Sequence, residues 1–411
     1  MMGKPALLAA VMAAVCLLLG SCMSRPENVL SPIVETAPAA SKVDMLVATT
    51  RQRADDPGTL FSGERGKAIS IDNIVVSIPP DQNRKVGEVQ WPRKLPGNPE
   101  KDFVTLKAER YTSGKQLTQW LDRNRGPKRR VLVFVHGFNN TYADAVYRFA
   151  QIAHDSRTEA APVLFTWPSR ANVLDYGYDK ESANFSRFAL EELLREAAAN
   201  PDVDEVTVLA HSMGGWLTVE ALRGIAMRDK RVSPKIKNVV LASPDIDVDV
   251  FRRQLVEMGP DHPHFTIIVS REDRALRLSK FISGDVDRVG AADVRPYGPM
   301  LKSLGITVID TSNIKSRGDL LKHNTFTDSP EMVRLLGQRL AGQTLAANDT
   351  TLGDQLGITI VGAVSAVGTA ADTVVSAPVA IISPTTRQRL LERFDAKGKP
   401  DDKTELGDIA Y

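Results

Sequence analysis

The sequence predicts an α/β fold in which helices cover both faces of a mostly parallel, doubly wound sheet. Six short, nearly continuous apolar segments follow one another from residue 130 onward, as expected for strands that are buried on both faces. Segments with apolar residues at helical spacing lie between them, and this alternation is typical of a parallel sheet. The six predicted strands are 131–135, 163–166, 206–210, 236–242, 265–269 and 306–309.

Size and composition fit a globular protein with a large core. The chain has 411 residues, of which 43% are hydrophobic and 25% charged, enough for one large domain with additions or for two domains. A net charge of only +2 argues against a dedicated nucleic-acid-binding protein. The two cysteines, Cys16 and Cys22, both lie near the N-terminus. The body of the protein therefore has no disulfide framework and no cysteine-ligated metal site.

The N-terminal residues predict an export signal over residues 1–21. A single cation, Lys4, precedes an apolar run that is short for a helix crossing about 30 Å of hydrocarbon. The run ends in LGSC, residues 19–22, which resembles the lipobox of bacterial lipoproteins and implies acylation at Cys22. Because Met23 replaces the aspartate that favours inner-membrane retention in such proteins, we expect an outer-membrane lipoprotein facing the periplasm. The alternative is a chance cysteine after an ordinary signal, giving a periplasmic or secreted protein.

Two segments separate this signal from the α/β core. Residues 22–42 are rich in Pro, Ser and Ala, a composition that predicts a flexible tether. Residues 43–125 contain short β-branched runs such as IDNIVVSI, residues 71–78, and turn signals such as Pro79-Pro80 and Pro96-Gly97. They predict a β-rich N-terminal section.

The α/β core is predicted over residues 126–345, with helices that connect the six strands. Two sets of apolar residues at helical spacing mark the first two helices. The first set is Val146, Phe149, Ala150 and Ala153, and the second is Phe185, Phe188, Ala189 and Leu193. A later helix is expected to begin at Ser329-Pro330-Glu331, where proline occupies the first helical position.

Residues 346–411 form a C-terminal extension with an apolar stretch at 356–383. Asp372 and Pro378 interrupt this stretch and make a clean membrane span improbable. We expect the stretch to pack against the body of the protein or against a partner, with membrane contact as the alternative.

One serine stands at a sharp junction between a predicted strand and a predicted helix. In VTVLAHSMGGWLTVEAL, residues 206–222, Ser212 follows the apolar strand directly. A serine nucleophile needs a base to take its proton and hydrogen-bond donors to hold the oxyanion that forms. A tight turn exposes the hydroxyl and points the free N–H groups of the helix at it, provided that nearby residues are small. Ala210 and Gly214 meet that requirement.

The segment from Ala210 to Gly214 resembles the nucleophile elbow of α/β hydrolases, whose pattern is G-x-S-x-G, with alanine in place of the first glycine. Upstream, VLVFVHGFNN, residues 131–140, resembles the loop that donates one oxyanion N–H in that fold. The resemblance implies that this donor is the N–H of Phe138 and that the second donor is the N–H of Met213.

In the fold that the elbow resembles, serine, acid and histidine follow in that order along the chain. This order leaves His262, His264 and His323 as possible bases. His262 and His264 precede a strand and belong to the wrong end of the sheet, and no carboxylate array supports a metal site there. His323 follows the last predicted strand and is the expected base. His136 and His211 are expected to be structural.

Two carboxylates compete as the acid that orients this histidine. Asp273 lies in the loop after the predicted strand 265–269, which is the usual place. Asp245 lies in the loop after the predicted strand 236–242 and remains the alternative acid. Either carboxylate would hold the imidazole in one tautomer and stabilise the imidazolium.

Taken together, VLVFVHGFNN, VLFTWPS (163–169), LAHSMGG (209–215), LASPDID (241–247) and SREDRAL (270–276) are similar to a bacterial α/β-hydrolase family of largely uncharacterised esterase-like and lipase-like proteins. The similarity covers residues 130–340 well and 43–125 loosely, and it does not extend to 346–411. It implies an α/β-hydrolase fold with Ser212, Asp273 and His323 as a catalytic triad. Trp167 and Pro168 are expected pocket walls.

The resulting functional prediction is a serine hydrolase that cleaves a small acyl ester through an acyl-enzyme. We expect no cofactor, no metal and no nucleic acid, and a membrane attachment through the lipid at Cys22. The alternative is a non-catalytic interaction protein of the cell envelope built on a hydrolase scaffold, because fold does not imply function.

Overall fold

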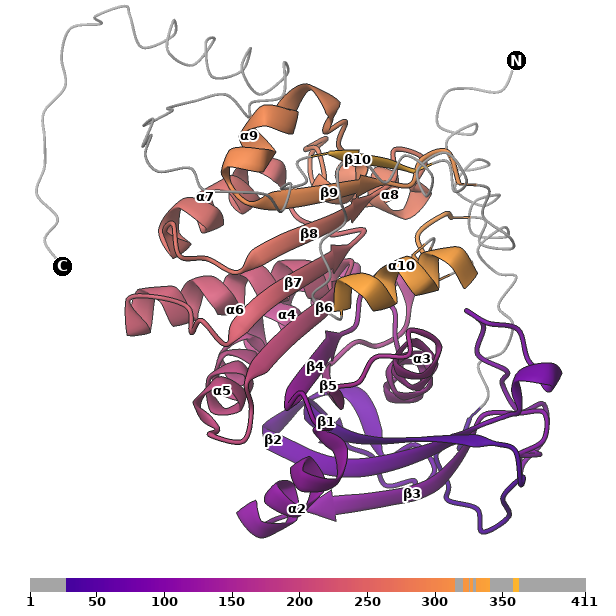
Figure 1. The fold of residues 1–411 in the computed structure, drawn as a ribbon. Helices are drawn as coiled ribbons and strands as arrows, with labels where there is room; N and C mark the ends of the chain where they lie inside the picture. Colours follow the sequence, from indigo (N-terminus) through magenta and orange to yellow (C-terminus); the bar gives the residue numbers. More distant parts are fainter. Residues whose placement is uncertain (1–26, 315–320, 325, 328–329, 341–357, 362–411) are drawn as a thin grey trace, which may run out of the picture.

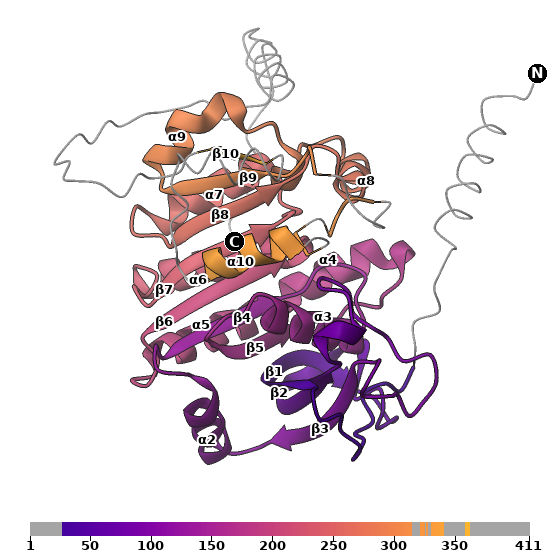
Figure 2. The same cartoon turned by 45° about the vertical axis from the view of Figure 1, so that its right-hand side comes forward.

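The computed structural model describes residues 27–314, 321–324, 326–327, 330–340 and 358–361. They form one ten-stranded sheet in the order β10-β9-β8-β7-β6-β4-β5-β1-β2-β3, with helices on both faces (Figures 1 and 2). The strands β9, β8, β7, β6, β4, β5 and β1 are parallel. The predicted α/β-hydrolase fold with a mostly parallel sheet is confirmed.

The predicted strands of the core agree with the observed ones to within two residues at each end. The described strands are β1 Ser41–Arg53, β2 Phe61–Ile78, β3 Val104–Tyr111, β4 Arg130–Val135, β5 Ala161–Thr166, β6 Glu205–His211, β7 Ile236–Ala242, β8 His264–Val269, β9 Ile306–Asp310 and β10 Thr359–Val361. The described α-helices are α2 Gly114–Asn124, α3 Tyr142–Asp155, α4 Tyr176–Phe185, α5 Arg187–Ala199, α6 Met213–Asp229, α7 Val248–Met258, α8 Arg274–Ile282, α9 Gly298–Ser303 and α10 Pro330–Leu340.

The strand order places a topological switch point at β4. In the sheet, β4 lies between β5 and β6, the two strands that follow it in the chain. Loops that leave β4 and β6 therefore turn to opposite faces of the sheet and open a crevice at their carboxyl ends. Ligand sites of open α/β sheets lie at such crevices.

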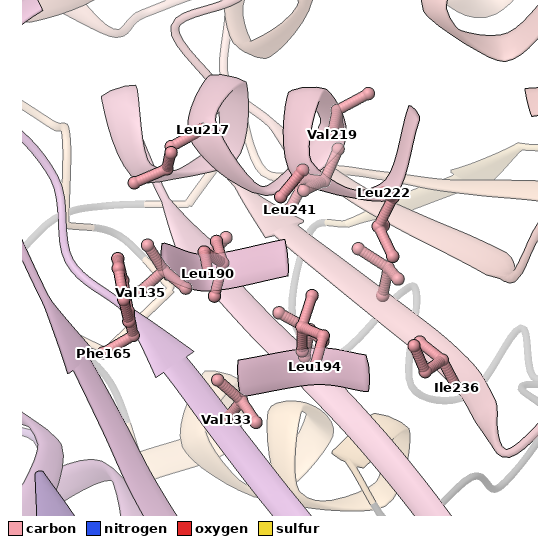
Figure 3. Close-up of a cluster of buried hydrophobic side chains, with 14 of the residues drawn as sticks. Val133, Val135, Phe165, Leu190, Leu194, Leu217, Val219, Leu222, Ile236 and Leu241 are labelled. Carbon is pink, nitrogen blue, oxygen red and sulfur yellow. The ribbon is translucent and has the colours of Figure 1, made fainter. Parts of the chain in front are cut away.

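Apolar side chains fill the space between the sheet and its helices. On one face, Leu190 and Leu194 of α5 and Leu217 of α6 pack on Val133 and Val135 of β4 (Figure 3). On the opposite face, α3 and α10 cover the sheet (Figure 1). Each fully buried side chain of this size contributes roughly 1.5–3 kcal/mol relative to an exposed one.

The second predicted set of buried helical residues is wrong in part. Phe185 and Phe188 are 49% and 60% exposed, whereas Leu190 and Leu194 are fully buried. Each phenylalanine ring instead lies beneath an arginine: Arg65 is above Phe185 at 5.8 Å, and Arg228 is above Phe188 at 5.2 Å. Phe185 ends α4 and Phe188 lies in the first turn of α5, so the two rings do not belong to one continuous helical face.

The N-terminal section is β-rich as predicted, and it continues the sheet of the core. β1 pairs in parallel with β5, and β2 and β3 extend the sheet as antiparallel strands. Residues 27–42 also belong to this body, because Val29 and Leu30 are buried and the Val29 carbonyl accepts a hydrogen bond from Tyr147 at 2.7 Å. The predicted tether is therefore wrong over residues 27–42, while residues 1–26 lie outside the described residues.

The C-terminal part of the chain adds an edge strand. Thr359–Val361 (β10) pairs antiparallel with β9, so this short part of the predicted extension packs against the body. The rest of 346–411 and Ser329 lie outside the described residues, whereas α10 begins at Pro330, the predicted first helical position. Within the part of the chain that the structure describes, no helix is both long and apolar enough to cross a bilayer.

Candidate active site

The loops that follow β4, β6, β7 and β9 meet where the parallel strands end (Figure 1). They line a cavity of about 360 Å3 together with segments from α4 and α8. Phe138, Ser212 and His323 are among its lining residues. Residues far apart in the sequence therefore share one cavity.

Ser212 occupies a strained turn between β6 and α6. Its backbone has φ 52° and ψ −123°, a conformation that costs a non-glycine residue about 1–3 kcal/mol. The strain is compatible with an abrupt change from strand to helix, in which the side chain reaches the cavity. Hydrogen bonds hold the turn on both sides: Ser212 N–H donates to Ala242, and the Ser212 carbonyl accepts from Asp245 N–H at 3.1 Å.

Gly214 allows the turn to lie against β4. A Cβ at this position would stand 2.3 Å from the His136 carbonyl oxygen and 2.6 Å from that of Val135. Both contacts are with backbone, which has little freedom to move. The predicted need for a small residue two positions after the serine is thus confirmed. Ala210, the small residue two positions before, is fully buried.

We expect Gly214→Ala to lower the free energy of unfolding by about 3 kcal/mol or more, because its methyl group overlaps two carbonyl oxygens. Chemical denaturation followed by circular dichroism measures the change. The matched control is Gly177→Ala in α4, where a Cβ meets nothing within 4 Å. Alanine there should leave stability unchanged or raise it by up to about 1 kcal/mol. Equal stability of the two variants would contradict the close approach.

Asp273 and His323 form a direct hydrogen bond. Nδ1 of His323 lies 2.7 Å from Oδ2 of Asp273, which is fully buried. The other carboxylate oxygen accepts a hydrogen bond from Leu276 N–H at 2.9 Å and so caps α8. The histidine loop is held as well, because Arg274 N–H donates to the Leu321 carbonyl at 2.9 Å. Contacts other than the one with His323 therefore also hold the Asp273 carboxylate in place.

Asp245 serves different partners. Its carboxylate accepts hydrogen bonds from Ser279 Oγ at 2.6 Å and Tyr176 Oη at 2.9 Å, and it pairs with the buried Arg288 at 3.3 Å. These contacts tie α4 to α8 below the cavity. Of the two acids that the sequence left open, the structure brings Asp273 to His323.

The other histidines near the serine are packed into the protein. The His211 ring lies 4.6 Å from that of His323, and burial, followed by the effect of His323, lowers its pKa well below the usual value. His136 is buried and stacks on Trp167 at 4.9 Å. Trp167 is itself fully buried and donates its indole N–H to the His136 carbonyl. Neither Trp167 nor Pro168 is among the described residues that line the cavity, so their prediction as pocket walls is wrong.

The loop after β4 is fixed around Phe138 by hydrogen bonds on both sides. The carbonyls of Gly137 and Phe138 accept from the Asn140 side chain at 3.2 and 2.8 Å. The N–H of Asn139 donates to Asp179 at 3.4 Å, and the N–H of Asn140 donates to Ser169 Oγ at 3.1 Å. The loop then ends at the capped first turn of α3. The orientation of the Phe138 peptide is therefore set before any ligand binds.

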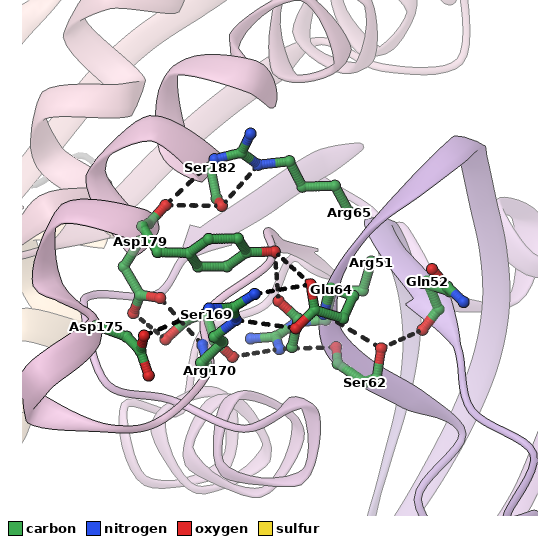
Figure 4. Close-up of polar contacts among 12 residues, drawn as sticks. Arg51, Gln52, Ser62, Glu64, Arg65, Ser169, Arg170, Asp175, Asp179 and Ser182 are labelled. Atoms are coloured by element: carbon green, nitrogen blue, oxygen red, sulfur yellow. Dashed lines mark hydrogen bonds and ion pairs between the residues drawn. The ribbon is translucent and has the colours of Figure 1, made fainter.

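Arg51 of β1 bonds the end of this loop at Asn140, and Figure 4 shows its side chain beside Ser169 and Ser62. Its guanidinium is fully buried and donates to the carbonyls of Asn140 at 2.8 Å and Ser169 at 3.0 Å, and to Thr166 Oγ1 at 3.0 Å. Burial lowers its pKa to about 10, so it stays charged at neutral pH. The role of Arg51 could not be predicted from the sequence, where the only signal is a cation after the polar pair Thr49-Thr50.

Buried histidines should make the fold sensitive to acid. Burial lowers the pKa of His136 to about 3, whereas an unfolded histidine titrates near 6.5. The unfolded chain thus binds more protons between these values, so the free energy of unfolding should fall as pH drops below about 6.5. Urea titrations between pH 7.5 and pH 4.5 measure this slope.

Asp72 of β2 should oppose that loss. Burial raises its pKa to about 6, above the value near 3.9 of an unfolded aspartate. Its contribution to stability therefore grows as pH falls from about 6 to about 4. Asp72→Asn should make the acid-induced loss steeper in this range, and an unchanged slope would contradict the effect of burial at Asp72.

A comparison with families of known proteins agrees with the fold. A family described as "Alpha/beta hydrolase of unknown function (DUF900)" matches residues 113–339, more than half of the chain. No curated protein matches.

Solved structures of hydrolases resemble parts of the chain at low identity. An esterase of Rhizomucor miehei is 11% identical over 75% of this chain and 85% of its own, with a TM-score of 0.34. Carboxyl esterase 2 of Tuber melanosporum is 12% identical over 80% and 97%, with a TM-score of 0.33. A predicted CIB-like hydrolase of Thermoplasma acidophilum is 14% identical over 53% and 88%, with a TM-score of 0.33. The family match over residues 113–339 carries the assignment: this chain belongs to the family of α/β hydrolases of unknown function.

Proposed function

We propose that the protein is a serine hydrolase that cleaves an ester-type acyl bond, with Ser212 as nucleophile, His323 as base and Asp273 as the orienting acid. The observation that carries the proposal is the 2.7 Å contact between His323 Nδ1 and a buried Asp273 carboxylate, beside a cavity that Ser212 also lines. A carboxylate on Nδ1 selects the tautomer whose Nε2 accepts a proton.

The proposed reaction proceeds through an acyl-enzyme. Ser212 Oγ attacks the carbonyl carbon while His323 Nε2 takes the hydroxyl proton, and the negative charge develops on the carbonyl oxygen. The N–H groups of Phe138 and Met213 stabilise this oxyanion. The C–O bond then breaks as the imidazolium protonates the leaving alcohol. Water, deprotonated by His323, then attacks the acyl-enzyme. The bond to Ser212 Oγ breaks as the imidazolium returns its proton to Oγ, and the carboxylic acid is released.

Local structure supports both oxyanion donors. Met213 is the first residue of α6, so its N–H has no partner within the helix and lies at the positive end of the helix dipole. The Phe138 peptide belongs to the loop that Arg51, Asp179 and Ser169 hold in place. Donors fixed in advance lose no free energy to reorganisation during the reaction.

Labelling with a fluorophosphonate probe tests the proposal directly. The purified protein should react covalently at Ser212, and both Ser212→Ala and heat denaturation should abolish the label. A folded wild-type protein that stays unlabelled would favour the alternative, a non-catalytic interaction protein of the cell envelope.

Arg51 provides a test of the preorganised loop. We expect Arg51→Met to lower kcat by about tenfold to a hundredfold with little change in KM, because a misplaced oxyanion donor weakens transition-state binding; complete loss of one donor costs about 10² to 10³. Stability should also fall, by about 1–3 kcal/mol for each buried carbonyl that loses its donor. Arg65→Met is the matched control, since Arg65 is exposed and binds Ser182 of α4 at 3.0 Å instead of the loop. A KM effect alone would contradict the positioning role.

We further propose that Cys22 is acylated and attaches the protein to the outer membrane, facing the periplasm. The LGSC segment after an apolar run supports this attachment. Incorporation of labelled palmitate into the wild-type protein, and its loss in Cys22→Ser, would test the proposal.

A further inference from the structure

Two exposed apolar segments border the cavity that contains Ser212. Leu278, Phe281 and Ile282 lie on one side of α8, at the spacing of one helical face, and Phe281 is 79% exposed. In the second segment, the short helical turn Val173–Asp175 carries Val173 and Leu174, of which Leu174 is 84% exposed. We call these five apolar side chains the apolar rim.

The two halves of the apolar rim are held together. Leu278, Ile282 and Val173 all line the cavity that contains Ser212. Tyr176, which directly follows the turn Val173–Asp175, has its hydroxyl 3.0 Å from Ser279 Oγ on α8. The two segments of the rim therefore lie on elements that contact each other and border the same cavity. Exposed apolar surface of this kind marks an interaction site.

The charges on α8 indicate which kind of partner the apolar rim binds. α8 carries the cations Arg274, Arg277 and Lys280 and no acidic residue. Arg277 and Lys280 also pair with acids outside the helix, at 3.8 Å and 2.7 Å. A basic amphipathic helix with exposed apolar residues is typical of a segment that lies on an anionic membrane surface.

The N-terminal end of the body lies on the same side as the cavity. Tyr147 bonds the Val29 carbonyl, and its ring is 5.0 Å from that of Trp91, which lines the cavity. Cys22 is only five residues before Glu27, the first described residue, and five residues span at most about 17 Å. An acyl group at Cys22 would therefore keep this side of the protein close to the bilayer.

We propose that the apolar rim docks on the surface of an anionic phospholipid bilayer, so that the cavity of Ser212 opens onto lipid. The membrane surface is the occupant because it satisfies the exposed apolar side chains and the cations of α8 together. This surface goes beyond the proposed hydrolase activity and would persist without it.

Site-specific fluorescence tests the docking. The full chain carrying Cys16→Ser and Cys22→Ser receives one new cysteine, Phe281→Cys or Leu174→Cys, labelled with a polarity-sensitive fluorophore. The matched controls are Phe188→Cys on α5 and Val256→Cys on α7, at positions that are 60% and 66% exposed. Because the N-terminal apolar segment is retained in every chain, all four reach vesicles equally, and the probes report only which face meets lipid.

With vesicles of phosphatidylglycerol and phosphatidylcholine, the probes at 281 and 174 should shift their emission to the blue, whereas those at 188 and 256 should not. Vesicles of phosphatidylcholine alone should require about tenfold more lipid for the same shift. Adding Ser212→Ala should leave the shift unchanged, which separates docking from catalysis. Equal shifts at all four positions, or none at 281 and 174, would overturn the proposal.

Discussion

Replacing Ser212 by alanine is expected to lower the turnover of short-chain p-nitrophenyl esters by about 10⁴-fold or more, because the proposed acyl-enzyme forms on this hydroxyl. The change removes one oxygen atom and keeps the backbone strain of the elbow, so the fold should survive. Steady-state kinetics on purified protein, with circular dichroism as a check of folding, measures the loss.

Ser77→Ala is a suitable control for this experiment. Ser77 is buried in β2, and its hydroxyl makes no hydrogen bond within the described part of the chain. Turnover by this variant should equal that of the wild type. Residual activity of Ser212→Ala near the wild-type level would refute Ser212 as nucleophile.

The second large effect is expected from Asp273→Asn, which should lower turnover by about 10⁴-fold. Asparagine can present an N–H instead of an acceptor to His323 Nδ1, which favours the wrong imidazole tautomer and removes the charge that stabilises the imidazolium. Its side-chain carbonyl can still cap α8 through Leu276. Binding should therefore suffer less than kcat.

Asp245→Asn is the informative comparison, since both acids follow neighbouring strands. Its carboxylate pairs with the buried Arg288, so the main expected effect is a loss of about 3 kcal/mol of stability. Its loss of kcat should be far smaller than that of Asp273→Asn. The reverse ranking of the two kcat values would identify Asp245 as the acid and contradict the role proposed for Asp273.

The parallel strands could be predicted closely because their sequences report their environment directly. A strand covered on both faces must be apolar at nearly every position, and β4 is recognisable on that ground alone. The elbow could be predicted for a related reason. The turn at Ser212 approaches β4 so closely that position 214 must be glycine, and a glycine at this spacing from the serine can be recognised in the sequence.

Predictions that depended on which face a residue takes were less successful. Phe185 and Phe188 have helical spacing, yet they face outward because Leu190 and Leu194 fill the space against the sheet. Val29 and Leu30 lie in a segment of linker-like composition. They are buried because they pack into the apolar cluster of the core that contains Tyr147. Composition does not reveal such packing.

The sequence alone determined in which order the candidate catalytic residues follow the strands along the chain. A serine follows one buried strand, candidate acids follow the next two, and a histidine follows the last. The tertiary structure decided which acid meets His323, that Arg51 of the distant strand β1 supports the loop of Phe138, and that Trp167 lies in the core. The physical reason is the range of the interactions. Burial and turn geometry act on neighbouring residues and leave a local pattern, whereas a hydrogen bond between residues fifty or more positions apart depends on how the whole sheet brings its loops together.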